Sequence, residues 1–294
     1  MTDKSRFPLY GGQAVIEGVM MRGTNSVAIA MRTPNKDITI HKEPLGALYK
    51  QKIIKIPFLR GLVMLLDALI LGTRALTISA NTQTGEDEKI EGPLLYFILF
   101  ISLAIGVGLF FLAPAALGQL SERFLRIGSW WGNLLEGLVR LILLVGYIWA
   151  VGQMPDIRRV FAYHGAEHKT INAYEAGSEL TPDNVAQFST KHPRCGTAFL
   201  LTLVLLSILV FSLLGPLPFW WRMASRILLL PFLACIAYEY IRWTANHLDS
   251  KLVRILIRPN LALQHLTTRE PTKDMLEVAI AAFNAMRSEE DIPV

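Results

Sequence analysis

Two long segments without a charged residue set the strongest limit on how this chain folds. Residues 94–117 lie in a stretch that carries no charge from position 92 to 121, and residues 196–221 form a second such stretch around an apolar core at 198–214. At about 1.5 Å of rise per helical residue, segments of this length reach across about 30 Å of hydrocarbon. Hydrophobic residues make up 52% of the chain and charged residues 18%, whereas soluble domains carry about 25% charged residues. The sequence therefore predicts an integral membrane protein.

Two shorter apolar segments add to these spans. Residues 138–154 contain one charge, Arg140, close enough to the start of the segment to snorkel toward the interface. Residues 227–241 carry Glu239 near their end. We therefore expect a mostly α-helical, polytopic membrane protein with about four transmembrane helices.

The distribution of basic residues predicts the orientation of these spans. Four spans place both termini and the loop at 155–194 on one side of the membrane. Twelve Lys and Arg residues precede the first span, five lie in that loop and six follow Trp243. Basic residues are enriched on the cytoplasmic side of membrane proteins, so we expect the termini and the loop to be cytoplasmic. The net charge of +5 comes from this scatter, and we expect no nucleic-acid partner. Fewer basic residues fall on the opposite side, at Arg123, Arg126, Arg222 and Arg226.

Residues 57–79 are apolar but are interrupted by Asp67. Arg60, Asp67 and Arg74 are spaced by seven residues, so they share one face of a helix. A fifth span here would place the basic N-terminus outside the cell. We therefore expect an interfacial helix, or one packed in the helix bundle.

The ends of the chain have other patterns. Residues 26–32 and 37–43 are predicted strands joined by a turn at 33–36, and Thr272 is a predicted N-cap of a C-terminal amphipathic helix. The apolar face of that helix consists of Leu276, Ala279, Ile280, Phe283 and Met286. The chain thus divides into a β-rich N-terminal segment (1–55), a helix with a linker (56–93), a first transmembrane hairpin (94–153), a cytoplasmic helical and loop region (154–197), a second hairpin (198–242) and a cytoplasmic tail (243–294).

A helix predicted at residues 161–176 carries polar side chains along one stripe. At about 100° per residue, His168 lies about 40° from His164, Glu167 about −60° and Glu175 about 20°. Two imidazoles one turn apart can bind one metal ion, and Glu167 is placed to take a proton from a bound water. The run His-Gly-Ala-Glu-His at 164–168 also has the His-x-x-Glu-His order of inverted zinc peptidases. The alternative is a solvated helix face on which the histidines bind nothing.

A second cluster stands just before the second apolar core, in the run His-Pro-Arg-Cys-Gly at 192–196. Either His192 or Cys195 can complete a ligand set, because zinc accepts imidazole nitrogen and thiolate sulfur. We therefore expect a divalent metal ion, with zinc as the first choice. Two alternatives stay open. Cys195 can be a nucleophile with His164 or His168 as its base, or His192 and Cys195 can be ordinary loop residues.

Two further carboxylates are candidate functional residues. Glu17 lies in an apolar run flanked by glycines, which indicate tight turns or a close approach of backbone. Glu239 is an ionisable residue within an apolar segment, a position that is often functional. For each, the alternative is a structural ion pair, between Glu17 and Arg22 or between Glu239 and Arg242.

Four separated motifs resemble those of the bacterial YqhQ family. They are GGQAVIEGVMMRG at 11–23, YHGAEHKT at 163–170, HPRCGT at 192–197 and LTTREP at 266–271. The resemblance implies a metal-dependent enzyme of the bacterial cytoplasmic membrane and brings no substrate with it. One departure is Pro259-Asn260, where relatives are expected to have Pro-Gly. Because Asn tolerates left-handed backbone, we expect the turn there to be kept.

The leading hypothesis is a metal-dependent, hydrolytic enzyme at the cytoplasmic surface of the bilayer. His164 and His168 are the expected ligands, with His192 or Cys195 as the third. Glu167 is the expected general base, and Glu175 a ligand or a partner of one. A lipid, a peptide, a nucleotide or another small molecule can be the substrate. The rival hypothesis is a non-enzymatic membrane protein whose polar motifs form a structural metal site or a docking surface for a partner.

Overall fold

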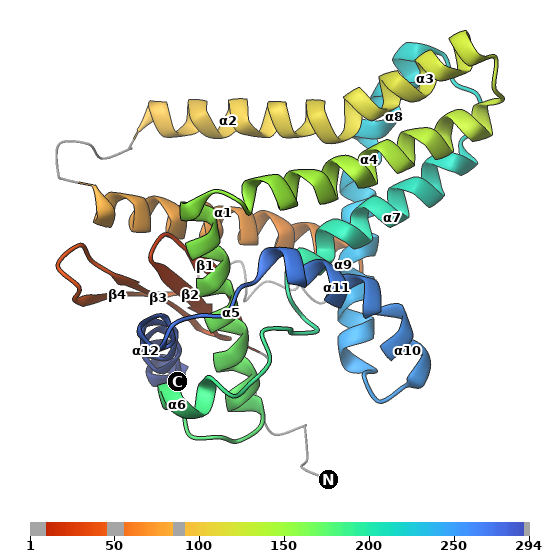
Figure 1. The fold of residues 1–294 in the computed structure, drawn as a ribbon. Coiled ribbons are helices and arrows are strands. Elements are labelled where there is room, and N and C mark those ends of the chain that lie inside the picture. The colour runs from red at the N-terminus through yellow and green to blue at the C-terminus, as the bar shows by residue number, and fades with distance from the viewer. Residues whose placement is uncertain (1–9, 46–55, 85–91, 291–294) are drawn as a thin grey trace.

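The computed structural model describes residues 10–45, 56–84 and 92–290. Within them the chain is mostly helical, with one small antiparallel sheet near the N-terminus (Figure 1). The expectation of a mostly α-helical chain with a β-rich N-terminal segment is therefore confirmed.

The sheet has four strands in sequence order, each antiparallel to the next. The predicted pair corresponds to β3 (Ser26–Arg32) and β4 (Ile38–Pro44), and the predicted turn between them is confirmed. The pattern missed β1 (Gly11–Val15) and β2 (Gly18–Arg22), because β1 contains two glycines and little alternation. Between these two strands lies Glu17, whose φ of 53° is the left-handed backbone that a tight hairpin needs.

Both faces of the two central strands, β2 and β3, are buried, and their side chains alternate between the two faces. Val19 and Ala28 face α5 (Pro155–Glu175) and α12 (Lys273–Glu290). Met20 and Ile29 face the other way, toward α1 (Leu59–Gln83). The sheet therefore lies between α1 on one side and the α5–α12 pair on the other (Figure 1).

The C-terminal helix is confirmed as an amphipathic element. It begins at Lys273, and the carbonyl of Thr272 accepts hydrogen bonds from the amides of Met275 and Leu276. Its predicted apolar face is buried against the sheet and α5, at Leu276, Ala279, Ile280, Phe283 and Met286.

Several helices are long and apolar. By length and composition three could cross a membrane: α1, the continuous rod of residues 93–125 and α4 (Ser129–Val151). The rod consists of α2 (Pro93–Val107), a π-helical turn η5 (Gly108–Leu112) and α3 (Ala113–Leu125). A fourth candidate is α8 (Phe219–Leu228) with α9 (Leu230–Asn246), which are bent by 40° at their junction, whereas α7 (Thr197–Leu213) is apolar but shorter, at 17 residues.

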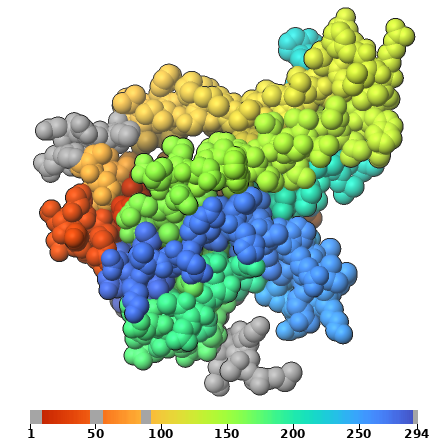
Figure 2. All heavy atoms as spheres, viewed as in Figure 1, coloured from red at the N-terminus to blue at the C-terminus, as the bar shows by residue number. Residues whose placement is uncertain are grey.

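The rod leaves large apolar side chains uncovered by protein. Tyr96 is 72% exposed and Phe100 is 67% exposed, and α2 forms a ridge along one edge of the molecule (Figure 2). Soluble proteins rarely expose contiguous apolar surface of this kind.

The helix α1 is held along its length by other elements. Gly61 lies against the backbone of Cys235 in α9, where an added Cβ would come within 3.1 Å of its Cα. The three charged residues that were predicted to share one face of this helix all form ion pairs. Arg60 pairs with Glu239, Asp67 with Arg22 and Arg74 with Glu43. Although its composition suits a span, α1 packs against both the sheet and α9.

Arg140 does not snorkel as predicted. It is fully buried and donates to the carboxylate of Glu136 at 2.8 Å, to Ser207 at 3.0 Å and to the carbonyl of Phe110 at 2.9 Å. Arg226 and Arg222, expected at the membrane edge, are buried on the same Glu136. An arginine that is paired with a buried carboxylate need not reach water.

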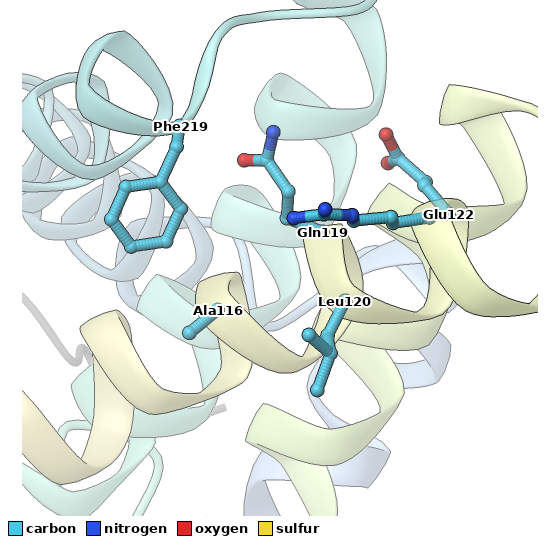
Figure 3. A pocket seen from close by; sticks show the side chains of 6 residues that line it. Ala116, Gln119, Leu120, Glu122 and Phe219 are labelled. Atoms are coloured by element: carbon cyan, nitrogen blue, oxygen red, sulfur yellow. The ribbon is translucent and has the colours of Figure 1, made fainter.

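A cavity of about 510 Å³ lies beside this ionic cluster. Figure 3 shows Gln119 and Glu122 from α3 and Phe219 from α8 around it. It contains no histidine or cysteine among its lining residues, so it is not the predicted site.

The remaining short helices connect these layers. They are α6 (Pro182–Val185), α10 (Lys251–Leu256) and α11 (Arg258–Thr267). The prediction of a turn at Pro259-Asn260 is wrong, because both residues lie in the first turn of α11. Asn260 is buried there and donates to the hydroxyl of Thr202 at 3.3 Å.

Candidate metal centre

The helix α5 carries the two histidines of the predicted stripe on one face. It begins at Pro155 rather than at residue 161, since proline suits a first turn whose amide has no helical acceptor. It ends as predicted at Gly177, whose φ is 71°. The amides of Gly177 and the next residue bond back to carbonyls of the last turn. The ring centroids of His164 and His168 are 4.4 Å apart.

Each histidine is held through its Nδ1 atom. His164 Nδ1 lies 2.8 Å from the carbonyl oxygen of Thr267, and His168 Nδ1 lies 2.5 Å from that of Thr190. A carbonyl only accepts, so each Nδ1 carries a proton, and Nε2 is the ring nitrogen left to bind a metal ion when the ring is neutral. Metal-binding histidines are oriented in this way by their outer partners.

Gly165 allows this arrangement by its lack of a side chain. An added Cβ would lie 2.1 Å from the carbonyl oxygen of Arg269. The segment after α11 therefore passes directly over the helix, and the amide of Arg269 donates to the carbonyl of Phe161 at 2.9 Å. Another backbone segment therefore lies close to Gly165.

Cys195 comes to the same place from the loop before α7. It is buried, and its Sγ lies 3.2 Å from His164 Nε2 and 3.1 Å from the hydroxyl of Thr197. The ligand atoms of His164, His168 and Cys195 all lie within 4.8 Å of one another. Around a tetrahedral zinc ion, such atoms stand about 3.3–3.6 Å apart.

The donor set suits a zinc ion for a second reason. His168 Nε2 is buried and has no hydrogen-bond partner among the described residues. A buried polar atom without a partner is uncommon and is often explained by an ion or a water. Two nitrogens and one sulfur also leave an open position, as catalytic zinc sites do.

Glu167 lies next to these atoms. It is 4% exposed, and its Oε2 is 3.8 Å from His164 Nε2. Burial raises the pKa of its carboxyl group to about 7, while His164 and the backbone amide of Gly12 act in the opposite direction. A Cβ on Gly12 would lie 2.8 Å from Glu167 Cγ, so this glycine makes room for the carboxylate.

His192 and Glu175 form a neighbouring pair instead of joining the three ligands. His192 is buried, with its ring centroid 5.7 Å from that of His168 and its Nε2 3.8 Å from Glu175 Oε2. Glu175 also forms an ion pair with Arg194. Of the two residues expected to supply a third ligand, the structure thus brings Cys195 to the histidines and leaves His192 beside them.

Glu17 and Glu239 lie outside the centre, and both form ion pairs with partners other than those expected. Glu17 pairs with Arg159 of α5, because Arg22 is engaged by Asp67. Glu239 pairs with Arg60 of α1 rather than with its neighbour Arg242.

Sequence reasoning missed the residues that position the centre. Gln264 of α11 is fully buried, and its side-chain amide bonds both the backbone N–H and the C=O of His192, at 2.9 and 2.8 Å. Thr190 and Thr267 act through backbone carbonyls, which no side-chain pattern reveals. Only Gln264 offered a signal in the sequence, as a polar residue directly after the apolar run at 261–263.

The centre opens into a cavity of about 570 Å³. His164, Glu167 and Cys195 line it together with Gly12 of β1. An apolar part of its wall comes from α1 and α9, at Met64, Leu65, Ala68, Leu71, Ile241 and Ala245.

Comparison with known proteins agrees with the resemblance seen in the motifs. The profile of the family described as "Protein of unknown function (DUF1385)" matches residues 56–289. The chain is 36% identical over 294 residues to the "Uncharacterized protein YqhQ" of Bacillus subtilis (strain 168), covering 95% of this chain and 92% of that one. No solved structure matches the chain. The chain therefore belongs to the DUF1385 family, and the YqhQ protein is a relative of this chain.

Proposed function

We propose that this protein is a metal-dependent hydrolase of the bacterial cytoplasmic membrane. His164, His168 and Cys195 would hold a divalent ion, zinc first, and Glu167 would act as the general base. The observation that carries the proposal is the set of three converging ligand atoms, two of them on histidines fixed through Nδ1. Catalytic sites place a carboxylate of this kind beside the ion without making it a ligand.

The metal ion, Glu167 and the cavity wall would have separate roles in hydrolysis. A zinc ion bound here would polarise the scissile group and lower the pKa of a water molecule. Glu167 Oε2, 3.8 Å from His164 Nε2, is placed to accept a proton from that water and to return it to the leaving group. The walls from α1 and α9 would limit access of bulk water.

The packing of the N- and C-terminal elements supports the membrane arrangement. The sheet, α5 and α12 share one hydrophobic core, to which Ala28, Tyr163 and Phe283 all belong. They must therefore lie on one side of a bilayer, so the chain crosses an even number of times between them. The rod at 93–125 and α4 supply two crossings before α5. A third crossing, by α1, would make the number odd and place the sheet and α5 on opposite sides of the membrane.

After α5, two crossings again return the chain to the same side. They are α7, about 25 Å long at 1.5 Å per residue, and the bent α8–α9 pair. Four crossings follow, with α1 packed against the sheet and α9 instead of crossing. The excess of Lys and Arg on the side of the sheet supports a cytoplasmic placement for both termini and for the metal centre.

Metal content tests the proposal. We expect His164→Ala and His168→Ala to lower the bound metal of the purified protein at least about tenfold, since outer partners of a ligand alone contribute that much. Glu167→Gln should keep the metal and lose function in a growth or activity assay, because a general base does not anchor the ion. Full metal content in both histidine variants would rule out the centre. Retained function in Glu167→Gln would leave a structural metal site.

A second function has one observation in its favour. The 3.2 Å contact between Cys195 Sγ and His164 Nε2 also fits a cysteine nucleophile and its base. Alkylation separates the two, because a metal-bound thiolate is protected until a chelator removes the ion. We expect slow alkylation of Cys195 that a chelator accelerates. Rapid alkylation without chelator, with the buried Cys235 unreactive as the internal control, would favour the nucleophile.

A further inference from the structure

The cavity beside the metal centre combines two kinds of wall. One is apolar and belongs to α1 and α9, where Met64, Ala68 and Ile241 line the space. The other is polar and contains Glu167 and Cys195. At about 570 Å³ the cavity falls within the usual range of small-molecule sites. A molecule that fills it must be amphipathic.

Three arginines contribute guanidinium groups to the lining of the cavity. Arg22, Arg194 and Arg242 all face the cavity, against the single carboxylate of Glu167. Arg22 is paired with Asp67 and Arg194 with Glu175. Among the described residues Arg242 acts on Glu239 through its charge, while Glu239 forms its ion pair with Arg60. Guanidinium groups bind phosphate and carboxylate oxygens well, so the polar part of the ligand should be anionic.

A peptide fits this cavity less well than a lipid. Peptides commonly bind by adding a strand to a sheet edge, and β1 is the edge strand nearest the centre. Its Gly12 amide already bonds the Glu167 carboxylate, and the Ile16 amide beyond it donates to Ser79 at 3.2 Å. The apolar surface of α1 and α9, in contrast, matches an acyl chain.

The position of α1 provides a route from the bilayer. Its side chains that do not face the sheet include Leu66, Leu69 and Ile70, which are 51%, 55% and 63% exposed. An exposed apolar helix face of this kind is suited to contact with the acyl chains of a membrane. Leu65 and Ala68 of the same helix line the cavity, so the cavity and the lipid would meet along α1.

We propose that the cavity binds an anionic membrane lipid, with its acyl chain along α1 and α9 and its headgroup among the arginines beside the metal centre. This names the substrate class of the hydrolase proposed above and rests on that function. The lipid binding itself is measured without turnover.

The test is native mass spectrometry of the full-length protein in detergent, titrated with dioleoyl phosphatidylglycerol or dioleoyl phosphatidylcholine. The two lipids share their chains and differ in net charge. We expect one tightly bound phosphatidylglycerol and at least about fivefold weaker phosphatidylcholine. Ala68→Trp should weaken both lipids about tenfold, because it displaces methylene groups from the apolar wall. Arg242→Gln should weaken phosphatidylglycerol alone, about fivefold.

Matched controls are Ala150→Trp on the exposed face of α4 and Arg258→Gln on α11, neither of which lines the cavity. Both should bind like the parent protein. Equal binding of the two lipids, or no effect of both Ala68→Trp and Arg242→Gln, would overturn the proposal and favour a peptide or nucleotide ligand. Metal analysis of the same samples separates the two claims. If the protein binds metal but no lipid, the lipid site is wrong and the metal centre stands. If it binds lipid but no metal, the proposed hydrolase is wrong and the lipid site stands.

Discussion

At the scale of single residues, two glycines decide the geometry of the centre. Gly12 makes room for the Glu167 carboxylate, and Gly165 lets the segment at Arg269 pass over α5. That segment follows Thr267, whose carbonyl holds His164. The ligand geometry therefore depends on backbone contacts as much as on the ligands themselves.

Gly165→Ala tests this dependence. An added methyl group 2.1 Å from the Arg269 oxygen forces the crossing segment away, and overpacking of this kind costs about 1–3 kcal/mol. We expect a lower thermal unfolding midpoint in detergent, together with reduced metal content. Gly146→Ala in α4 is the matched control, since nothing lies within 4 Å of its added Cβ and alanine favours a helix by about 1 kcal/mol. Equal midpoints for the two variants would contradict the crowding seen at Gly165.

At the scale of elements, the apolar helices are joined by buried charge. Glu136 of α4 bonds Arg140 of the same helix and Arg226 of α8, and all three side chains are at most 1% exposed. Arg140 also lies over the rings of Phe111 and Phe211, 5.2 Å from each centroid. A paired network of this kind fixes which helices are neighbours, whereas apolar surfaces alone are interchangeable.

Glu136→Gln should destabilise the helix bundle strongly. It leaves two buried arginines without their carboxylate, and breaking a buried pair costs about 3–5 kcal/mol. Thermal unfolding in detergent measures the effect. Glu289→Gln removes an exposed partner of Lys42, with both side chains 42% exposed, and should cost at most about 1 kcal/mol. A Glu136 variant as stable as this control would show that the network contributes nothing.

At the scale of the whole molecule, the shared core of the sheet, α5 and α12 makes a prediction about topology. Single cysteines at Thr24 and Glu179, on that core's side, should resist a membrane-impermeant maleimide in intact cells. A cysteine at Arg126, in the turn between α3 and α4, should react. All three positions are exposed, so the membrane alone separates them. Reaction at Thr24 with protection at Arg126 would reverse the orientation, and different results for Thr24 and Glu179 would contradict the shared core.

The sequence by itself determined what local rules control. Apolar runs predicted the long helices, alternation predicted β3 and β4, and helical periodicity placed His164 and His168 one turn apart, because each pattern depends only on near neighbours along the chain. Gly177 and Thr272 marked helix ends for the same reason.

Only the tertiary structure decided which distant residues meet. Cys195 rather than His192 lies against His164, Arg159 rather than Arg22 pairs with Glu17, and Arg140 is buried on Glu136 instead of reaching the interface. Composition alone also leaves α1 free to cross a membrane. Its packing against the sheet and α9 is a long-range contact, and long-range contacts depend on how whole faces fit together rather than on any local pattern.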